Sequence, residues 1–403
     1  MADFTKAGRQ FELRVPGFRA AGAAAGIKKN GKKDLAVIVS DSPASVAGVF
    51  TTNSVKAAPV LLDMKRIKKG LASGLIVNSG NANACTGKEG MRNAEAMAEM
   101  AERTLGLKKG SVLVASTGVI GVPLPIEKVE KGLPLLSRSL GYEGLGQAAE
   151  AMMTTDAFPK KTVMKAKIGG VEVTLAGIAK GAGMICPDMA TMLAFFFTDA
   201  RIKAPALSKA LKAAVDLSFN SIIVDNDTST NDTVLAFANG AGNGGEIREG
   251  TRELDSFTVL LTAASTELAH MIVKDGEGAT RFVEIEVSGA ASAADARRAA
   301  RTVAESYLCK TAFFGGDPNW GRIIAAIGRA GVRMREERTA VSFNGVQVVL
   351  KGLDTGKERE AARAMKKKEL LVLVDLGAGK ASSRVWTTDL TYEYVKINSA
   401  YRT

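Results

Sequence analysis

The order of apolar and polar positions along the chain predicts strands and helices in mixed sequence. Short apolar runs rich in β-branched residues are typical of strands, and apolar positions every three or four residues are typical of helices. Strands are predicted at residues 35–40, 47–52, 75–79, 111–115, 233–238, 283–289, 339–345, 346–352, 370–377 and 382–398, with a hairpin over 163–175. Helices are predicted at residues 94–105, 125–140, 204–217, 252–274, 293–307 and 358–368, with a shorter one near Gly321.

This mixed order of elements bears on the fold class. Strict alternation of strands and helices would indicate a doubly wound parallel sheet, whereas mixed order favours a layered α/β sandwich of mixed sheets. The chain has 403 residues, which is more than one hydrophobic core usually organises. We therefore expect two subdomains or two halves of one large sandwich.

The segment from Lys180 to Ala200 joins a glycine-rich connection to an apolar run. Gly181 and Gly183 permit backbone torsions that a side chain would forbid, so the segment begins as a tight connection. No charged residue occurs between Met189 and Thr198, which predicts a strand buried on both faces. Thr191 lies at the junction, where a hydroxyl group would be held at the start of a rigid strand.

Charge and aromatic content narrow the class of partner. The formal net charge is +12, but aromatic residues make up 5% of the chain and the lysines are scattered. Nucleic-acid-binding proteins usually cluster their cations and interleave aromatic residues for stacking. The sequence therefore predicts no nucleic-acid partner, and the positive field suits small anionic substrates.

Cysteine usage and hydropathy bear on the compartment. The three cysteines are widely separated and form no CxxC pair, which argues against a disulfide framework and fits a reducing cytoplasm. The N-terminus has no apolar signal core, and no run approaches the roughly 18 uncharged residues of a membrane-spanning helix. We therefore expect a soluble, cytoplasmic protein without a membrane partner.

The chain has one histidine, His270, in the middle of the predicted helix at 252–274. A lone histidine on a helix is usually a surface or structural residue. Its isolation excludes a Ser-His-Asp or Cys-His arrangement unless His270 is itself the base, and it removes most zinc sites. Any acyl-transfer chemistry would need a base of another kind.

The run KGAGMICPDMATML at 180–193 resembles the self-cleavage segment of the glutamate N-acetyltransferase family, also called the ornithine acetyltransferases. The family's other blocks occur in order and span nearly the whole chain. They are GFRAAG at 17–22, AGVFTTN at 47–53, NSGNANACTG at 78–87, STGVIG at 116–121, TTDAFPK at 154–160, DTSTND at 227–232, GEGATRF at 276–282, DPNWGR at 317–322 and VKINSAYRT at 395–403. The sequence departs from the family at Cys186, Asp188, Asn226 and Arg402, and Asp188 places a negative charge near the cleaved bond.

The resemblance implies a self-processing protein that is similar to N-terminal-nucleophile enzymes. Cleavage between Ala190 and Thr191 would give chains 1–190 and 191–403, with Thr191 as the nucleophile. A free α-amine has an unperturbed pKa of about 7.7–8.0, so it can accept the proton of the hydroxyl on the same residue. The required base is then supplied without histidine, and no metal or organic cofactor is needed.

The resemblance also assigns the remaining site residues. Thr117 and Gly118 match the residues that form the family's oxyanion hole, which stabilises a tetrahedral intermediate. The positions that match the family's substrate contacts, together with Thr191, are Thr154, Lys180, Glu277, Asn398 and Thr403. Lys180 can pair with a carboxylate, and Glu277 can pair with the ammonium group of ornithine.

The activity implied is transfer of an acetyl group from N2-acetylornithine to glutamate in arginine biosynthesis, by an α2β2 heterotetramer of the two fragments. The motifs leave open whether acetyl-CoA is a second donor. Two alternatives remain at this point. A related N-terminal-nucleophile amidase or aminopeptidase would pass the acyl group to water, and a basic binding protein would catalyse nothing.

Overall fold

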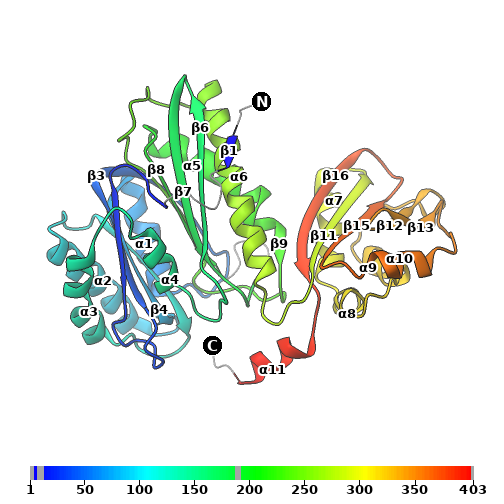
Figure 1. The fold of residues 1–403 in the computed structure, drawn as a ribbon, viewed down its shortest axis with the longest axis horizontal. Coiled ribbons are helices and arrows are strands. Elements are labelled where there is room, and N and C mark those ends of the chain that lie inside the picture. The colour runs from blue at the N-terminus through cyan, green and yellow to red at the C-terminus, as the bar shows by residue number, and fades with distance from the viewer. Residues whose placement is uncertain (1–3, 7–12, 187–191, 401–403) are drawn as a thin grey trace.

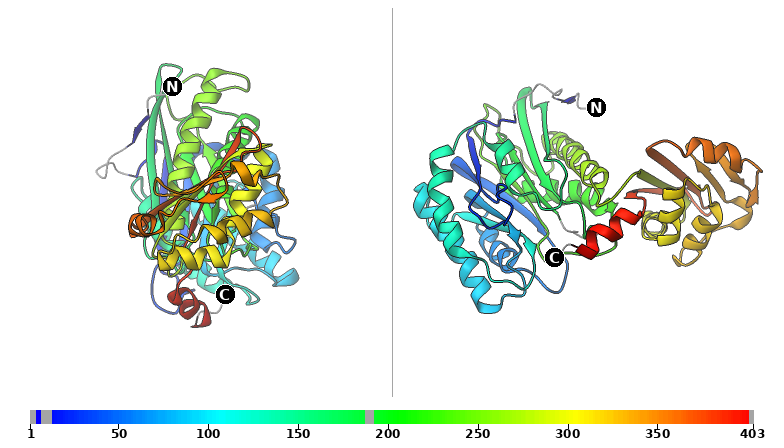
Figure 2. Two further views of the ribbon diagram at one scale, coloured as in Figure 1. Left: turned by 90° about the vertical axis from the view of Figure 1, so that its right-hand side faces the viewer. Right: turned by 60° about the horizontal axis from the view of Figure 1, so that its bottom comes forward.

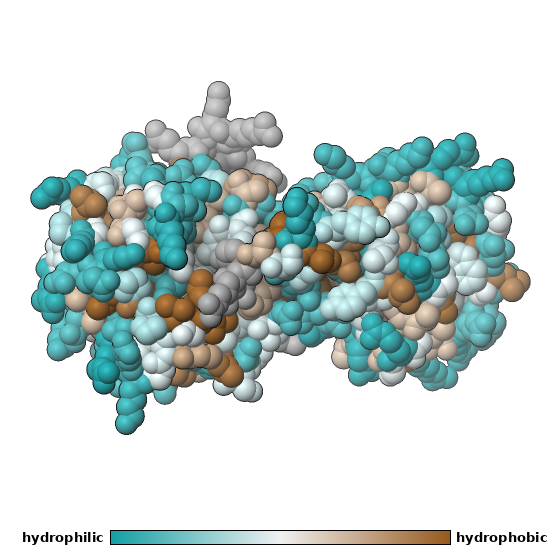
Figure 3. Space-filling view, turned by 90° about the horizontal axis from the view of Figure 1, so that it is seen from below, coloured by the Kyte–Doolittle hydropathy of each residue, from teal (hydrophilic) through white to brown (hydrophobic). Residues whose placement is uncertain are grey.

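The computed structural model describes residues 4–6, 13–186 and 192–400, which form a large lobe and a small lobe joined at a narrow waist (Figures 1 and 3). The large lobe contains a nine-stranded mixed sheet. Its strands are β1 (Phe4–Lys6), β2 (Phe18–Ala23), β3 (Leu35–Phe50), β4 (Leu71–Asn81), β5 (Val112–Val119), β6 (Lys160–Ile168), β7 (Val171–Lys180), β8 (Leu193–Thr198) and β10 (Thr233–Ala238).

Strand β3 joins two halves of this sheet: one half contains β2, β4 and β5, and the other contains β1, β6, β7, β8 and β10. Its first part pairs with β2 and β4, its last part pairs with β10, and the register with β4 shifts between Val39 and Ala44. We predicted two strands here, separated by a turn at 41–45. That prediction was wrong, because the exposed polar residues Asp41 and Ser42 lie within one continuous strand and do not end it.

The two halves of the sheet enclose a shared apolar core. Side chains alternate along β8, so Leu193, Phe195 and Phe197 face this inner core, and Ala194 and Phe196 face outward. In the other half, Leu75 and Val77 of β4 face inward. All six residues of β8 are buried, as the uncharged run predicts.

Helices cover the outer faces of both halves (Figure 1). Helices α1 (Ala58–Arg66), α2 (Gly87–Leu105) and α3 (Ile126–Ser139) pack on the half that contains β4 and β5. Helices α5 (Ala204–Leu217) and α6 (Arg252–Lys274) pack on the other half, and α4 (Leu145–Ala151) packs against the inner core. The predicted layered α/β sandwich of mixed sheets is confirmed.

Strand β8 lies between β7, to which it is antiparallel, and β10, to which it is parallel. The predicted cleavage point, Ala190–Thr191, falls between β7 and β8 and lies outside the described residues. Two chains that ended and began there would still share one sheet. The strands on both sides of the point are held by the sandwich.

The small lobe is built on a second sheet, whose strands are β11 (Phe282–Ala290), β12 (Ala340–Phe343), β13 (Val346–Leu350), β14 (Leu353–Asp354), β15 (Glu369–Asp375) and β16 (Ala381–Thr388). Strand β9 (Ile222–Ile223) comes from the part of the chain that forms the large lobe and pairs with β16. The lobe's helices are α7 (Ala293–Ala304), α8 (Tyr307–Gly315), α9 (Trp320–Gly328) and α10 (Glu358–Ala364). The helix predicted at 293–307 is thus replaced by two, because Ser306 caps α8 by accepting from the amide of Cys309.

The end of the chain differs from the prediction of a strand over 382–398. Strand β16 ends at Thr388, and helix α11 (Tyr392–Ala400) follows. The hydroxyl of Thr391 accepts a hydrogen bond from the amide of Tyr394, which satisfies one of the free donors at the start of this helix. Helix α11 returns from the small lobe toward the large lobe (Figure 2), and it carries Asn398 with it.

Helix α6 is long and apolar enough to cross a membrane by length and composition alone. Half of its most apolar window is buried inside the protein, and its buried side chains belong to the core formed with β6 and β7. We interpret α6 as a core helix of the sandwich, and its C-terminal end leads directly to Asp275 and Glu277.

Candidate active site

Six of the predicted site residues line a single cavity of about 190 Å³. They come from segments far apart in the sequence: the end of β5, the loop after α4, the end of β7, the loop after α6, and α11. These residues are Thr117, Gly118, Thr154, Lys180, Glu277 and Asn398. The other three, Ala190, Thr191 and Thr403, lie outside the described residues. Met192 directly follows Thr191, is buried in the core and precedes β8.

Thr117 and Gly118 lie at the end of β5, where it runs parallel to β4. Gly118 has a φ of +136°, and a Cβ at this position would lie 2.3 Å from the carbonyl carbon of Gly80. Only glycine fits there. The backbone of β4 and β5 therefore fixes where the Gly118 amide lies.

Asn231, which also lines the cavity, supports the same strand end. Its side-chain amide donates to the carbonyl oxygens of Ala82, at 2.6 Å, and of Ser116, at 2.8 Å, and it is buried. In the sequence analysis, Asn231 appears only as part of the DTSTND block, without a role of its own. Its contacts place it directly before Thr117, so it holds the predicted oxyanion residues through the backbone.

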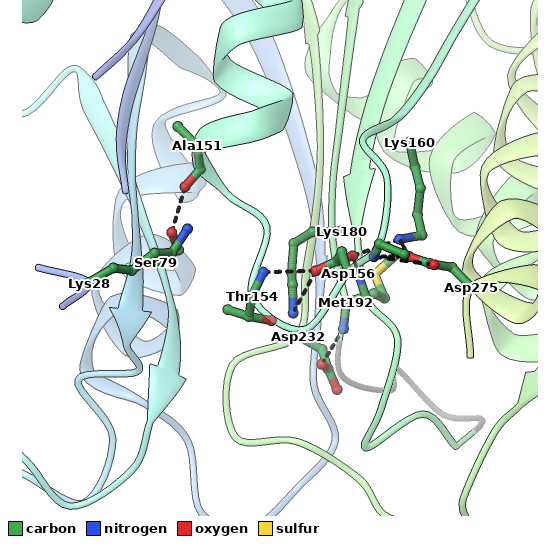
Figure 4. A network of polar contacts seen from close by, with 12 residues as sticks. Lys28, Ser79, Ala151, Thr154, Asp156, Lys160, Lys180, Met192, Asp232 and Asp275 are labelled. Atoms are coloured by element: carbon green, nitrogen blue, oxygen red, sulfur yellow. Dashed lines mark hydrogen bonds and ion pairs between the residues drawn. The ribbon is translucent and has the colours of Figure 1, made fainter. Parts of the chain in front are cut away.

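A buried network of charges surrounds Asp156 (Figure 4). The carboxylate accepts from the backbone amides of Thr154, at 2.9 Å, and Gly181, at 2.7 Å. It also pairs with Lys160 at 2.6 Å and with Lys180 at 3.9 Å. Burial opposes the charge, but Lys180 and Lys160 outweigh it and hold the pKa of Asp156 below its usual range.

Lys180 is itself buried, with 3% of its surface exposed, and lines the cavity. Burial lowers its pKa from the ordinary value, with Lys160 acting in the same direction, while Asp156 and Glu277 raise it. Asp156 is therefore the carboxylate that most favours the charged form of Lys180. An anionic group that entered the cavity would gain a nearly dehydrated ion pair with Lys180.

Glu277 also lines the cavity and contacts the glycine-rich connection after β7. Its amide donates to the carbonyl of Ala182 at 2.9 Å, and its carboxylate accepts from the side-chain amide of Asn398 at 2.9 Å. A Cβ at Gly183 would lie 2.4 Å from a carboxylate oxygen of Glu277. Gly183 thus permits the carboxylate to lie against the segment that precedes the predicted cleavage point.

Comparisons with known proteins identify the family of this chain. Residues 19–403 match the family model described as the ArgJ family. A protein named arginine biosynthesis bifunctional protein ArgJ, from Geobacter sulfurreducens, is 52% identical over 97% of this chain and 100% of its own length. The chain belongs to the ArgJ family. It is an enzyme of arginine biosynthesis, and the family predicted from the motifs is confirmed.

Other ArgJ relatives are similar over comparable lengths. One from Symbiobacterium thermophilum is 49% identical over 96% of this chain and 97% of its own. A crystal structure of ArgJ from Bacillus halodurans has 38% identity and a TM-score of 0.50, covering 51% of this chain and 98% of the solved chain. A structure titled ornithine acetyltransferase complexed with ornithine, from Mycobacterium tuberculosis, has 39% identity and a TM-score of 0.43. The match covers 46% of this chain and 98% of the solved chain.

In this ArgJ-family chain, Asp225 is a lining residue that the sequence analysis missed. Its carboxylate accepts from the amides of Met184 and Ile185, both at 2.7 Å, and Met184 has a positive φ of 58°. Burial raises the pKa of Asp225 to about 6, with Glu277 adding to the effect. No spacing in the sequence links residue 225 to this turn, 40 positions away.

His270 takes no part in the ArgJ site, as its position on the helix suggested. Its ring packs against Trp386, at 4.5 Å between centroids, and against Phe282, at 5.1 Å. Burial lowers its pKa to about 4. His270 is therefore a structural residue at the junction between α6 and the small-lobe sheet, and it does not line the cavity.

Proposed function

We propose that this enzyme transfers the acetyl group of N2-acetylornithine to glutamate through an acetyl-Thr191 intermediate, after its own cleavage between Ala190 and Thr191. The observation that carries the proposal is the single cavity in which Thr117 and Gly118 lie with Lys180 and Glu277. Groups for an oxyanion, a carboxylate and an ammonium thus line one cavity.

In the proposed reaction, the free amine of Thr191 accepts the proton of the threonine hydroxyl as its oxygen attacks the acetyl carbonyl carbon. The hydroxyl of Thr117 and the amide of Gly118 donate to the oxyanion that forms. The bond to the ornithine nitrogen then breaks, and that nitrogen takes the proton back from the Thr191 amine. The amine of glutamate attacks the resulting ester and regenerates Thr191.

The charges of the cavity support recognition of ornithine. Lys180 would pair with the α-carboxylate, and Glu277 with the side-chain ammonium, held in place by Asn398. Thr154 and Thr403 complete the proposed contacts. Asp225 and Asp227 also line the acidic side and add to its attraction for a cation.

Two observations support cleavage. The predicted point separates β7 from β8, which are neighbours in one sheet, so two fragments would stay together after the bond opened. In addition, the solved ArgJ chain from Bacillus halodurans is 98% covered by about half of this chain. Both fit a mature enzyme of two fragments, 1–190 and 191–403, with a fold of the N-terminal-nucleophile kind.

We further propose that the fragments assemble as an α2β2 heterotetramer in the cytoplasm, and that the reaction needs no metal or organic cofactor. Within the described residues, no group of three or more His, Cys, Asp or Glu side chains is arranged to hold a metal ion. Whether acetyl-CoA is a second donor can be tested by supplying it with glutamate and measuring N-acetylglutamate.

Incubation with N-acetylornithine, with and without glutamate, tests the reaction type. The proposal predicts N-acetylglutamate and ornithine in equal amounts, with product formation dependent on glutamate. Acetate released at the same rate without glutamate would instead indicate the hydrolytic alternative, the N-terminal-nucleophile amidase or aminopeptidase.

A further inference from the structure

One carboxylate holds two predicted substrate contacts that lie on different segments. Asp156 Oδ2 accepts from the amide of Thr154 at 2.9 Å and lies 3.9 Å from Nζ of Lys180. Its other oxygen, Oδ1, accepts from the amide of Gly181 at 2.7 Å. The loop after α4 and the end of β7 are thus joined through a single side chain (Figure 4).

This side chain is rigid for a physical reason. Its exposed fraction is 0%, and both oxygens are hydrogen-bonded, so no water competes for them. Lys160, also fully buried, pairs with Oδ1 at 2.6 Å and with Asp275 at 2.6 Å. Removing one partner from a buried, fully paired network leaves the others unsatisfied, which makes their arrangement strongly preferred.

We propose that Asp156 is the positioning residue of the carboxylate-binding site: it aligns Thr154 with Lys180, holds a negative charge beside the Lys180 ammonium group, and so sets affinity for the α-carboxylate of the substrate. The inference rests on the proposed function and extends it to a residue that lines no part of the cavity. Asp156 acts through Thr154 and Lys180.

Asp275 offers a matched control within the same network. It pairs with Lys160 as closely as Asp156 does, and it accepts from the amide of Ala157 at 3.0 Å. In the part of the chain that the structure describes, no hydrogen bond or ion pair joins Asp275 to Lys180 or Thr154. Replacing either aspartate by asparagine removes one negative charge from beside Lys160. Only Asp156→Asn also removes the ion-pair partner of Lys180.

The charge of Lys180 gives a readout that a purely structural role would not move. Lys180 interacts with Lys28, Asp156, Lys160, Asp232 and Glu277. Burial lowers its pKa and Asp156 raises it, so the loss of Asp156 lowers the pKa further. Lys180 would then lose its charge at a lower pH, and carboxylate binding would fail at a lower pH.

The experiment measures the Kd of ornithine by calorimetry from neutral to alkaline pH, together with KM and kcat for N-acetylornithine. For Asp156→Asn we expect Kd and KM to rise about tenfold to a hundredfold, the range of a lost charge-assisted contact, with a smaller change in kcat. The alkaline loss of binding should move to lower pH. Asp275→Asn should leave the position of that loss unchanged.

Asp156→Glu provides a second variant if Asp156→Asn fails to fold. It keeps the charge but moves it by one methylene, so Kd should rise while the alkaline loss stays near its wild-type pH. The proposal would be overturned if the pH at which ornithine binding is lost moved equally in Asp156→Asn and Asp275→Asn. A wild-type Kd for ornithine in Asp156→Glu would also overturn it. Ornithine binding without acetyl transfer would overturn the proposed reaction and leave the role of Asp156 standing.

Discussion

The backbone amide of Met192 donates a hydrogen bond to Oδ1 of Asp232 at 2.9 Å. A buried carboxyl group therefore contacts the residue that directly follows the predicted nucleophile, Thr191. Burial raises the pKa of Asp232 well above its usual range, and Lys180 only partly offsets this. The same backbone is held by the amide of Thr233, which donates to the carbonyl of Met192. Asp232 and Thr233 therefore hold both the amide and the carbonyl of Met192, which would position the proposed nucleophile one residue earlier.

Replacing Asp232 by alanine should slow acetyl-enzyme formation at least tenfold, because the Met192 amide would lose its buried acceptor at a cost of about 1–3 kcal/mol. Asp232→Asn keeps an acceptor oxygen and should be affected much less. Rapid-mixing mass spectrometry of both variants measures the rates. Equal rates in Asp232→Ala and wild type would show that this contact does not position Thr191.

Gly118→Ala should abolish most acetyl-enzyme formation, because its Cβ would lie 2.3 Å from the Gly80 carbonyl carbon and force the Thr117–Gly118 pair apart from β4. Loss of an oxyanion donor costs about a hundredfold to a thousandfold in rate. Gly121→Ala is the control, since it also has a positive φ but no atom within 4 Å of the added Cβ. Similar rates in both variants would remove Gly118 from the oxyanion site.

Glu277→Gln should weaken ornithine binding about tenfold to a hundredfold, because the pair with the substrate ammonium loses its charge. The amide of Gln can still accept from Asn398, so the position of α11 should be kept. Glu393→Gln, an exposed change on α11, serves as the control. The Kd for ornithine is measured by calorimetry in both variants and in wild type. Unchanged affinity in Glu277→Gln would contradict the proposed role of Glu277.

His270→Phe should leave acetyl transfer within about twofold of wild type, since His270 packs on Trp386 away from the cavity. Its folded-state pKa of about 4 lies below the unfolded value of about 6.5, so folded protein loses stability as the pH falls between these values. The variant should flatten that part of the Tm-against-pH curve. Loss of activity with an unchanged curve would instead make His270 a base.

Sequence patterns predicted well those helices and strands whose own apolar residues determine which side chains are buried. Helix α6 and strand β8 carry enough apolar residues at regular spacing for their type and buried faces to be predicted. Helix α11 was mistaken for a strand, because residues 392–398 are rich in aromatic and β-branched residues, which are typical of strands. The signal that decides it is the Thr391 cap, one hydrogen bond at 3.3 Å.

The site residues likewise fall into a group that the sequence predicted and a group that it did not. The contiguous motifs led to Thr117, Lys180 and Glu277, because resemblance transfers residue by residue within a block. Contacts between blocks had no sequence signal. Lys160 and Asp275 are 115 positions apart and each could be interpreted as a loop or surface charge. Only the folded sandwich brings them together with Asp156.

The central claim is that Thr191 carries the acetyl group on a chain that begins at that residue. Intact-mass spectrometry after brief mixing with N-acetylornithine, followed by peptide mapping, tests it directly, with Thr191→Ala as the control. We predict two chains, 1–190 and 191–403, with one acetyl group on the first residue of the second chain and no cleavage or acetylation in the variant. Active enzyme with residues 190 and 191 still joined, or with the acetyl group on another side chain, would contradict this account.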